Sequence, residues 1–297
     1  MRLRHPSGRI VHLSCGISLD QAADVSAAVD RVAAANGALR EHFGTGTLTL
    51  ALRLSYRLAA TFAEDRRART RLRTELDARG LEVITLSGAP GGDGEGPSDW
   101  SGPSRVRHTL DLARILVDLL PFEEVRGAIA TSGLGRADEW DETRQKAGAR
   151  HLSRLSGGLA DLAWRVGRAV RAGFQPGPGQ VLDSPEQTVA ALSRIDKDRL
   201  GVYLDLATVL RDWPSPEAGI DRITDAGLSV VTARISDPGI AWQPLMRHLL
   251  AADAARTEYV DVDVPGTDEQ RGVALAYVLG ELTALGLVPE QQPCTAP

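Results

Sequence analysis

The feature of this sequence that most constrains its fold is a repeated alternation of short β-branched runs with longer segments of helical periodicity. The short runs end close to Gly, Ser or Asp, as strands do where they enter a loop. The segments expected to form strands are 9–15, 47–55, 81–86, 125–131, 200–205, 228–235 and 259–264. Because strands that alternate with helices pair in parallel, the sequence predicts a parallel α/β sheet.

A fifth strand is expected within residues 172–183, where the sheet signal is weakest because Gln175 begins a Gln-Pro-Gly-Pro-Gly segment. Eight strand candidates in about 290 residues match a single (β/α)₈ TIM barrel better than a doubly wound sheet. We therefore predict one barrel domain over residues 1–290, irregular around the fifth strand, and a flexible C-terminal tail at 291–297. Long polar loops are expected at 88–103 and 132–143. The expected helices are 19–42, 56–78, one from 104, 147–171, one from 184, 214–225, 242–252 and 268–285.

The composition and the absence of several motifs argue against some classes of function. A net charge of -5 argues against a nucleic-acid partner, which favours a basic face. The longest apolar stretches are too short for a membrane span, and no apolar segment follows the charged N-terminus. Without a P-loop or a G-x-G-x-x-G between strand and helix, no nucleotide cofactor is expected.

Two cysteines, Cys15 and Cys294, indicate a reducing cytoplasm. The Arg-rich, Lys-poor composition is typical of a GC-rich bacterial genome. The expected partner is a small-molecule metabolite, and the chain is compatible with a homo-oligomer.

Three aspartates end predicted strands at the rim where TIM barrels place their active sites: Asp205, Asp261 and Asp263. Asp261 and Asp263 are two residues apart and should project to the same face. The three carboxylates could hold Mg²⁺ or Mn²⁺, with Asp205 as the expected metal ligand, or act without metal as proton acceptors or cation stabilisers. The alternative is that Asp261 and Asp263 pair with arginines.

Two arginines lie inside otherwise apolar strands, Arg53 and Arg234. Burying an unpaired guanidinium is costly, so these side chains are expected either to point into the barrel mouth and bind an anion or to pair with Asp205 or Asp263. His12 and Gln175 complete the predicted substrate-binding set. For His12 a packing role is the alternative.

Several segments resemble, in order, the EboE-type metabolite traffic proteins, a branch of the xylose-isomerase-like sugar phosphate isomerase/epimerase barrels. Residues 48–55, LTLALRLS, are similar to that family's GLRLS strand, and 81–92, LEVITLSGAPGG, to its VFTINGFPYG. Further similar segments are 107–120, 127–132, 201–205 (GVYLD, against GVCLD) and 226–236.

The resemblance implies a barrel with its site at the C-terminal strand ends and a divalent ion held by carboxylates and histidines. In that superfamily the ion polarises a carbonyl and stabilises an enediolate during proton transfer. This chain departs from the pattern at most of the ligand positions. The family's EPEP aligns with 175–178, QPGP; its Cys-His with Ala207 and Thr208; its HFHVP with 261–265, DVDVP; and its final EVETYTW has no counterpart. Only Asp205 matches by identity.

Two functions therefore follow from the sequence. One is a secondary-metabolism enzyme that acts on a small biosynthetic intermediate by proton transfer, of isomerase, epimerase or lyase type, with Asp205, Asp261 or Asp263 as base or cation stabiliser. The other is a non-catalytic or metal-free protein that binds and carries a metabolite. The fold alone does not choose between them.

Overall fold

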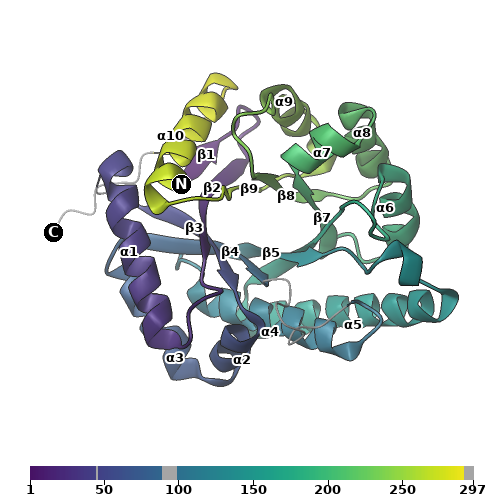
Figure 1. Cartoon of the computed structure of the whole chain (residues 1–297), viewed down its shortest axis with the longest axis horizontal. Coiled ribbons are helices and arrows are strands. Elements are labelled where there is room, and N and C mark those ends of the chain that lie inside the picture. Colours follow the sequence, from purple (N-terminus) through teal and green to yellow (C-terminus); the bar gives the residue numbers. More distant parts are fainter. Residues whose placement is uncertain (45, 89–98, 291–297) are drawn as a thin grey trace.

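Eight parallel strands close into a barrel in the computed structural model, which describes residues 1–44, 46–88 and 99–290 (Figure 1). The strands follow one another in chain order, and the last pairs with the first to close the barrel. This confirms the predicted single TIM barrel. The barrel strands are β2 (Ile10–Ser18), β3 (Leu48–Leu54), β4 (Leu81–Gly88), β5 (Arg126–Ser132), β6 (Ala169–Gln175), β7 (Leu200–Asp205), β8 (Val230–Ile235) and β9 (Tyr259–Val262).

Helices surround the barrel and bury their apolar stripes against it (Figure 1). The core consists largely of Leu, Val, Ile and Ala, as a chain with only 4% aromatic residues requires. None of the helices in the described ranges is long and apolar enough to cross a membrane. The helices are α1 (Val25–Phe43), α2 (Tyr56–Glu64), α3 (Arg66–Asp77), α4 (Pro103–Leu119), α5 (Glu142–Val166), α6 (Pro185–Leu192), α7 (Leu206–Asp212), α8 (Pro216–Asp225), α9 (Gln243–Ala251) and α10 (Asp268–Ala284), with short 3-10 turns η1 (Ala137–Glu139) and η2 (Asp253–Ala255).

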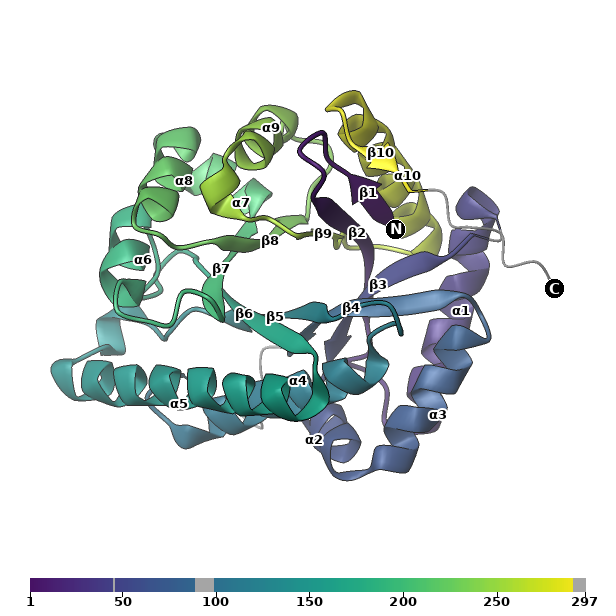
Figure 2. The ribbon, with the colours of Figure 1, turned by 180° about the vertical axis from the view of Figure 1, so that it is seen from behind.

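Two short strands that the sequence did not predict lie at the end of the barrel where the strands begin (Figure 2). β1 (Arg2–Arg4) pairs antiparallel with the start of β2 and with β10 (Val288–Pro289). Leu3 of β1 is fully buried. The first and last described segments of the chain therefore cover this end of the barrel together, and the opposite end remains for the site.

The fifth barrel strand begins earlier and is more regular than predicted. β6 pairs with β5 over seven consecutive residues, and its first residues, 169–171, were predicted to be helical. The preceding helix α5 ends at Val166, because Gly167 takes a left-handed conformation that stops it. The irregular segment follows the strand, at residues 176–184, where Gln180 forms an isolated bridge with Arg136.

The predicted helix over 56–78 is two helices. Asp65 ends α2 and caps α3, and its carboxylate accepts a hydrogen bond from the Arg67 backbone nitrogen at 2.8 Å. The first helix begins at Val25, later than expected, after Asp24 as its N-cap. Most of the predicted loop 88–103 and all of the tail 291–297 lie outside the described residues.

Candidate functional site

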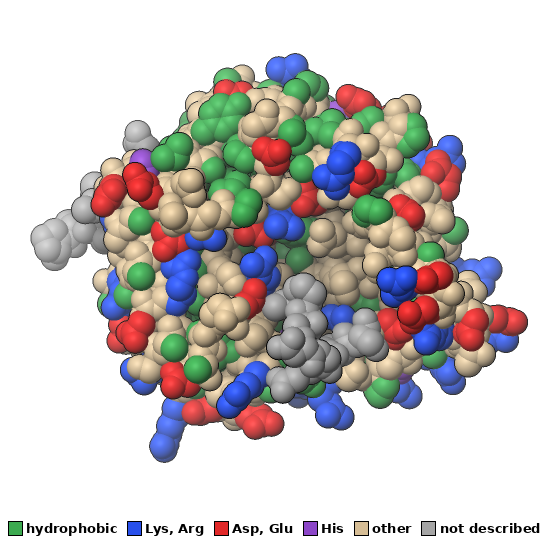
Figure 3. Space-filling view, in the orientation of Figure 1, with side chains coloured by type: hydrophobic (Ala, Val, Ile, Leu, Met, Phe, Trp, Pro, Cys, Tyr) green, Lys and Arg blue, Asp and Glu red, His purple; other side chains and the backbone are tan. Residues whose placement is uncertain are grey.

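A chain of alternating acids and arginines crosses the barrel where the strands end. Arg53 Nε lies 2.9 Å from Asp20 Oδ2, and Arg53 Nη1 lies 3.6 Å from Asp263 Oδ2. Arg234 continues the chain, with Nη2 2.8 Å from Asp263 Oδ2 and Nη1 3.4 Å from Asp205 Oδ2. We call these five residues the mouth network. Figure 3 shows acidic and basic side chains interleaved on the face seen in Figure 1.

Asp205 is fixed by the junction between β7 and α7. It is the last residue of the strand and the N-cap of the helix, where its Oδ1 accepts from the Ala207 backbone nitrogen at 3.1 Å. The Ser236 hydroxyl donates to the same oxygen at 2.7 Å. Only 7% of Asp205 is exposed, and the Arg234 guanidinium faces its other oxygen. Both carboxylate oxygens are thus engaged within the protein.

Arg234 is the centre of the network because of strand register. On β8 its backbone lies in register with Asp205 of β7 on one side and with Asp261 of β9 on the other. Burial by itself would lower the Arg234 pKa, but the nearby Tyr203 and the carboxylates of Asp263, Asp205 and Asp261 together raise it. The guanidinium is therefore a permanent cation held among three acids.

Asp261 lies deeper than the network and is only 3% exposed. Thr85 of β4 donates a hydrogen bond to its Oδ1 at 3.1 Å from across the barrel. Burial raises the pKa of Asp261 to about 7, and the neighbouring Asp263 also raises it, whereas the Thr85 hydrogen bond and Arg234 lower it. A carboxyl group that titrates near neutral pH can both accept and release a proton.

The described residues at the strand ends enclose a small space. A cavity of about 20 Å³ lies among the ends of the strands, with Tyr203, Asp261 and Asp263 in its wall. Such a volume is about what one water molecule needs. Burial raises the pKa of the Tyr203 hydroxyl far above its usual value, so this group stays protonated.

Gly16 on β2 makes room for Asp263. A Cβ at position 16 would lie 2.6 Å from the Asp263 Cβ and 2.7 Å from its Oδ1, closer than atoms can pack. Only a residue without a side chain therefore lets Asp263 fold over β2 toward Arg234.

We expect Gly16→Ala to lower the free energy of unfolding by about 1–3 kcal/mol, because the added methyl group must push Asp263 or the strand aside. Urea denaturation measures this effect. The control is Gly157→Ala in α5, where nothing lies within 4 Å of the new Cβ and helix propensity favours alanine. An equal change in the free energy of unfolding for Gly16→Ala and Gly157→Ala would contradict the role given to Gly16.

The structure brings most of the predicted site residues together at the mouth. Asp205, Asp261, Asp263, Arg53 and Arg234 meet at the mouth, and both arginines contact aspartates, which was one of the two alternatives for them. Gln175 ends β6, in register with Ser132, on the same rim.

His12 belongs to the opposite end of the barrel, so its predicted place at the mouth is wrong. It pairs with Arg2 of β1, stacks on Tyr259 and lies 3.6 Å from Glu124. Burial lowers the His12 pKa to about 3, so the ring is neutral. This is the packing role that the sequence left as the alternative.

Sequence reasoning missed several residues of the mouth, namely Asp20, Thr85, Tyr203, Ser236 and Gly16. Thr85, Tyr203 and Gly16 lie within predicted or extended strands, and a systematic list of residues near strand ends would have included them. Asp20 follows β2 in a loop, and the pairing of β2 with the neighbouring β3, in which Ser18 lies opposite Arg53, brings it to Arg53.

The mouth as it stands does not fit a divalent cation. Within the described residues no group of three His, Cys, Asp or Glu side chains could hold a metal ion. The expected ligand, Asp205, turns one oxygen to Ser236 and to the start of α7, and the other to Arg234. The Arg234 guanidinium thus takes the place among the acids that a metal would need.

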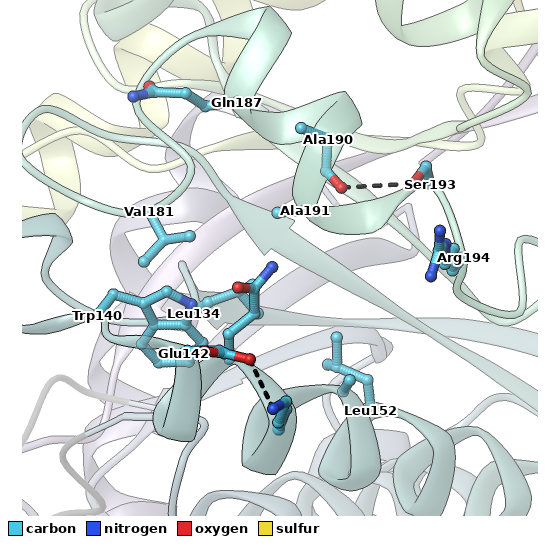
Figure 4. A pocket seen from close by; sticks show the side chains of 13 residues that line it. Leu134, Trp140, Glu142, Leu152, Val181, Gln187, Ala190, Ala191, Ser193 and Arg194 are labelled. Atoms are coloured by element: carbon cyan, nitrogen blue, oxygen red, sulfur yellow. Dashed lines mark hydrogen bonds and ion pairs between the residues drawn. The ribbon is translucent and has the colours of Figure 1, made fainter.

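A larger groove of about 720 Å³ lies between α5 and α6 (Figure 4). Leu134, Trp140, Leu152 and Val181 give it an apolar floor. The Glu142–Lys146 ion pair, at 2.6 Å, is exposed at its rim. Because the buried acids and arginines gather at the mouth and not in this groove, we take the mouth as the candidate site.

Solved structures share the fold. No family model and no curated protein sequence matches the chain. A D-tagatose 3-epimerase-like protein is similar with a TM-score of 0.61 and 14% identity, over 92% of this chain and 98% of that one. A xylose isomerase-like TIM-barrel protein from Mycobacterium smegmatis, solved in complex with magnesium, has a TM-score of 0.58 and 15% identity, over 95% and 94%. The 3-keto-D-glucoside 4-epimerase from E. coli has a TM-score of 0.58 and 11% identity, over 92% and 100%.

Proposed function

We propose that this chain is a metal-independent enzyme of the isomerase or epimerase type, which transfers a proton on a small polar metabolite at the barrel mouth. Asp261 is the proton-transfer group, and Arg234 is the cation that stabilises the charge formed during transfer. The observation that carries the proposal is the position of Arg234, held between Asp205 and Asp263 and in register with Asp261.

The chemistry follows from these positions. Removing a proton from a carbon next to a carbonyl leaves negative charge on the carbonyl oxygen, which needs a fixed positive group. Arg234 supplies that charge without moving, because two aspartates hold it. Asp261 has a pKa of about 7, which suits a group that must accept a proton and return it near neutral pH. Tyr203, protonated in the same cavity wall, offers a further hydroxyl donor.

The neighbours support the reaction class. Two of the structures described above are a sugar epimerase and an epimerase-like protein. A carbonyl sugar is therefore a reasonable model substrate for the proposed proton transfer. In this proposal the natural substrate is a small biosynthetic intermediate of secondary metabolism, as the resemblance to metabolite traffic proteins implies. Arg53, about a third exposed, is placed to bind its outer oxygen atoms.

The second candidate is a protein that binds such a metabolite without converting it. It is favoured by the pairing of Arg53, Arg234, Asp205 and Asp263 with one another, because these charges are then neutralised within the protein.

One experiment separates the candidates. Carbonyl sugars such as tagatose are incubated with the protein in D₂O, and deuterium uptake is followed by NMR before and after treatment with a chelator. We expect uptake that the chelator does not change and that Asp261→Asn abolishes. Binding without uptake across the substrates would support the carrier.

Metal dependence is tested in parallel. Mg²⁺ and Mn²⁺ are titrated into wild type and Asp205→Asn by calorimetry, and we expect no stoichiometric binding to either. Stoichiometric binding to wild type that Asp205→Asn abolishes would overturn the metal-independent proposal, because the acids would then hold a metal after all.

A further inference from the structure

A second pocket, of about 310 Å³, opens at the end of the barrel opposite the mouth. It lies where β5, β6, β7 and β9 begin, and Leu159 and Ala163 of α5 form one wall. Its charged residues are four arginines and two acids: Arg126, Arg171, Arg199, Arg256, Asp198 and Glu258. The lining therefore carries an excess of positive charge.

Two of the arginines have acidic partners. Arg126 Nη1 lies 3.1 Å from Glu258 Oε1, and Arg199 Nη1 lies 2.7 Å from Asp196 Oδ2. Arg171 and Arg256 differ, because within the described ranges neither has a carboxylate oxygen within 4 Å. The net positive charge that remains is thus that of these two residues less the carboxylate of Asp198, which also lines the pocket.

Arg171 is half-buried, and its guanidinium donates hydrogen bonds to uncharged acceptors. Its Nε donates to the Asp198 backbone oxygen at 3.1 Å, and its Nη2 donates to the Ser229 hydroxyl. Burial lowers the Arg171 pKa, as do the charges of Arg256 and Arg126, and the nearby Glu258, which contacts Arg126, offsets only part of this. An anion in the pocket would supply the missing counter-charge.

Arg256 is exposed and lines the same pocket, three residues before β9 begins. Its backbone has φ 49°, and it is the one non-glycine residue of the described chain with positive φ. A left-handed arginine is unusual, and here the turn after η2 places its side chain in the pocket lining.

We propose that this pocket binds a small organic phosphate, with the phosphate between Arg171 and Arg256 and the organic part against Leu159, Ala163 and Val170. Guanidinium groups match phosphate oxygens in geometry and charge. The volume lies within the range of small-molecule sites and exceeds what a bare phosphate fills. The site is independent of the mouth and of the reaction proposed for it.

The test is calorimetric titration of the full chain with phenyl phosphate and with inorganic phosphate, at constant ionic strength. The variants are Arg256→Asn, since asparagine tolerates a left-handed backbone, and Arg171→Gln. The matched control is Arg150→Gln, an exposed arginine of α5 that removes the same charge.

We expect one phenyl phosphate per chain, bound more tightly than inorganic phosphate, with affinity about tenfold lower in Arg256→Asn and unchanged in Arg150→Gln. Equal weakening in Arg256→Asn and Arg150→Gln would reduce the effect to general charge and overturn the proposal. It would also be overturned if Arg53→Gln, at the mouth, abolished binding while Arg256→Asn did not, or if neither phosphate saturated the protein.

Discussion

Asp261→Asn is expected to abolish proton transfer and, above pH 7, to make the folded protein more stable than the wild type. The loss should be about 10²–10⁴-fold in kcat, the range for removal of a general acid–base group. Asparagine has nearly the same shape and can keep the hydrogen bond that Thr85 donates, so the fold should remain intact. Rates of deuterium uptake measure the first effect and urea denaturation the second.

The gain in stability follows from the direction of the pKa shift. Burial raises the Asp261 pKa from 3.8 to about 7, so the folded protein binds this proton more tightly than the unfolded chain. The stabilisation that the folded protein gains by binding this proton is fully present below pH 3.8 and is lost as the pH rises through about 7. At pH 8 a buried charge remains, with a cost of at most about 4 kcal/mol. Asparagine never carries that charge.

The activity of the wild type should rise with pH over the range in which its stability falls. If Asp261 removes the proton, it must be ionised, so the wild-type rate should rise as the pH passes about 7. The control is Asp161→Asn, an exposed aspartate of α5, which should alter neither quantity. A difference in stability between Asp261→Asn and wild type that stays constant from pH 5 to pH 8 would contradict a carboxyl group that titrates in this range.

The barrel and most of the mouth could be predicted because both follow from periodicity. Strands that alternate with helices are parallel, so their final residues share one rim, and this rule brought together Asp205, Asp261, Arg53 and Arg234. The pairing of the arginines was predictable because a charged residue inside an apolar strand needs a partner. Strand register accounts for one partner of Arg234, Asp205, whereas the nearer partner, Asp263, follows the end of β9.

The errors arise where local pattern is ambiguous. His12 and the mouth lie along the same strand, but β2 has nine residues and extends about 30 Å, so membership of the strand does not say which end a residue occupies. Residues 169–171, Ala-Val-Arg, continue the Ala- and Arg-rich composition of α5, and only the left-handed Gly167 separates helix from strand. Asp20 is remote from Arg53 in sequence, and no short-range signal connects them.

Arg234→Met is expected to destabilise the protein more than any other single change at the mouth, by about 3–5 kcal/mol at pH 7. Methionine fills similar space but leaves Asp205 and Asp263 without the cation that both now contact. Because Asp205 is only 7% exposed, water cannot replace that cation efficiently. Urea denaturation of wild type and variant measures the loss.

Arg53→Met is the matched control. Its side chain is 35% exposed, its partner Asp20 lies in a loop and its other partner Asp263 keeps Arg234, so a loss of about 1 kcal/mol or less is expected. The double variant Arg234→Met/Asp263→Asn should recover part of the stability, since it removes one of the two carboxylates that lose Arg234, the one left with only the 3.6 Å contact to Arg53. Added Mn²⁺ should also stabilise Arg234→Met and not the wild type, because the freed carboxylates could then bind a cation. A loss of stability no larger than that of Arg53→Met would mean that Arg234 does not hold the acids of the mouth together, and the role proposed for it in stabilising charge would fail with it.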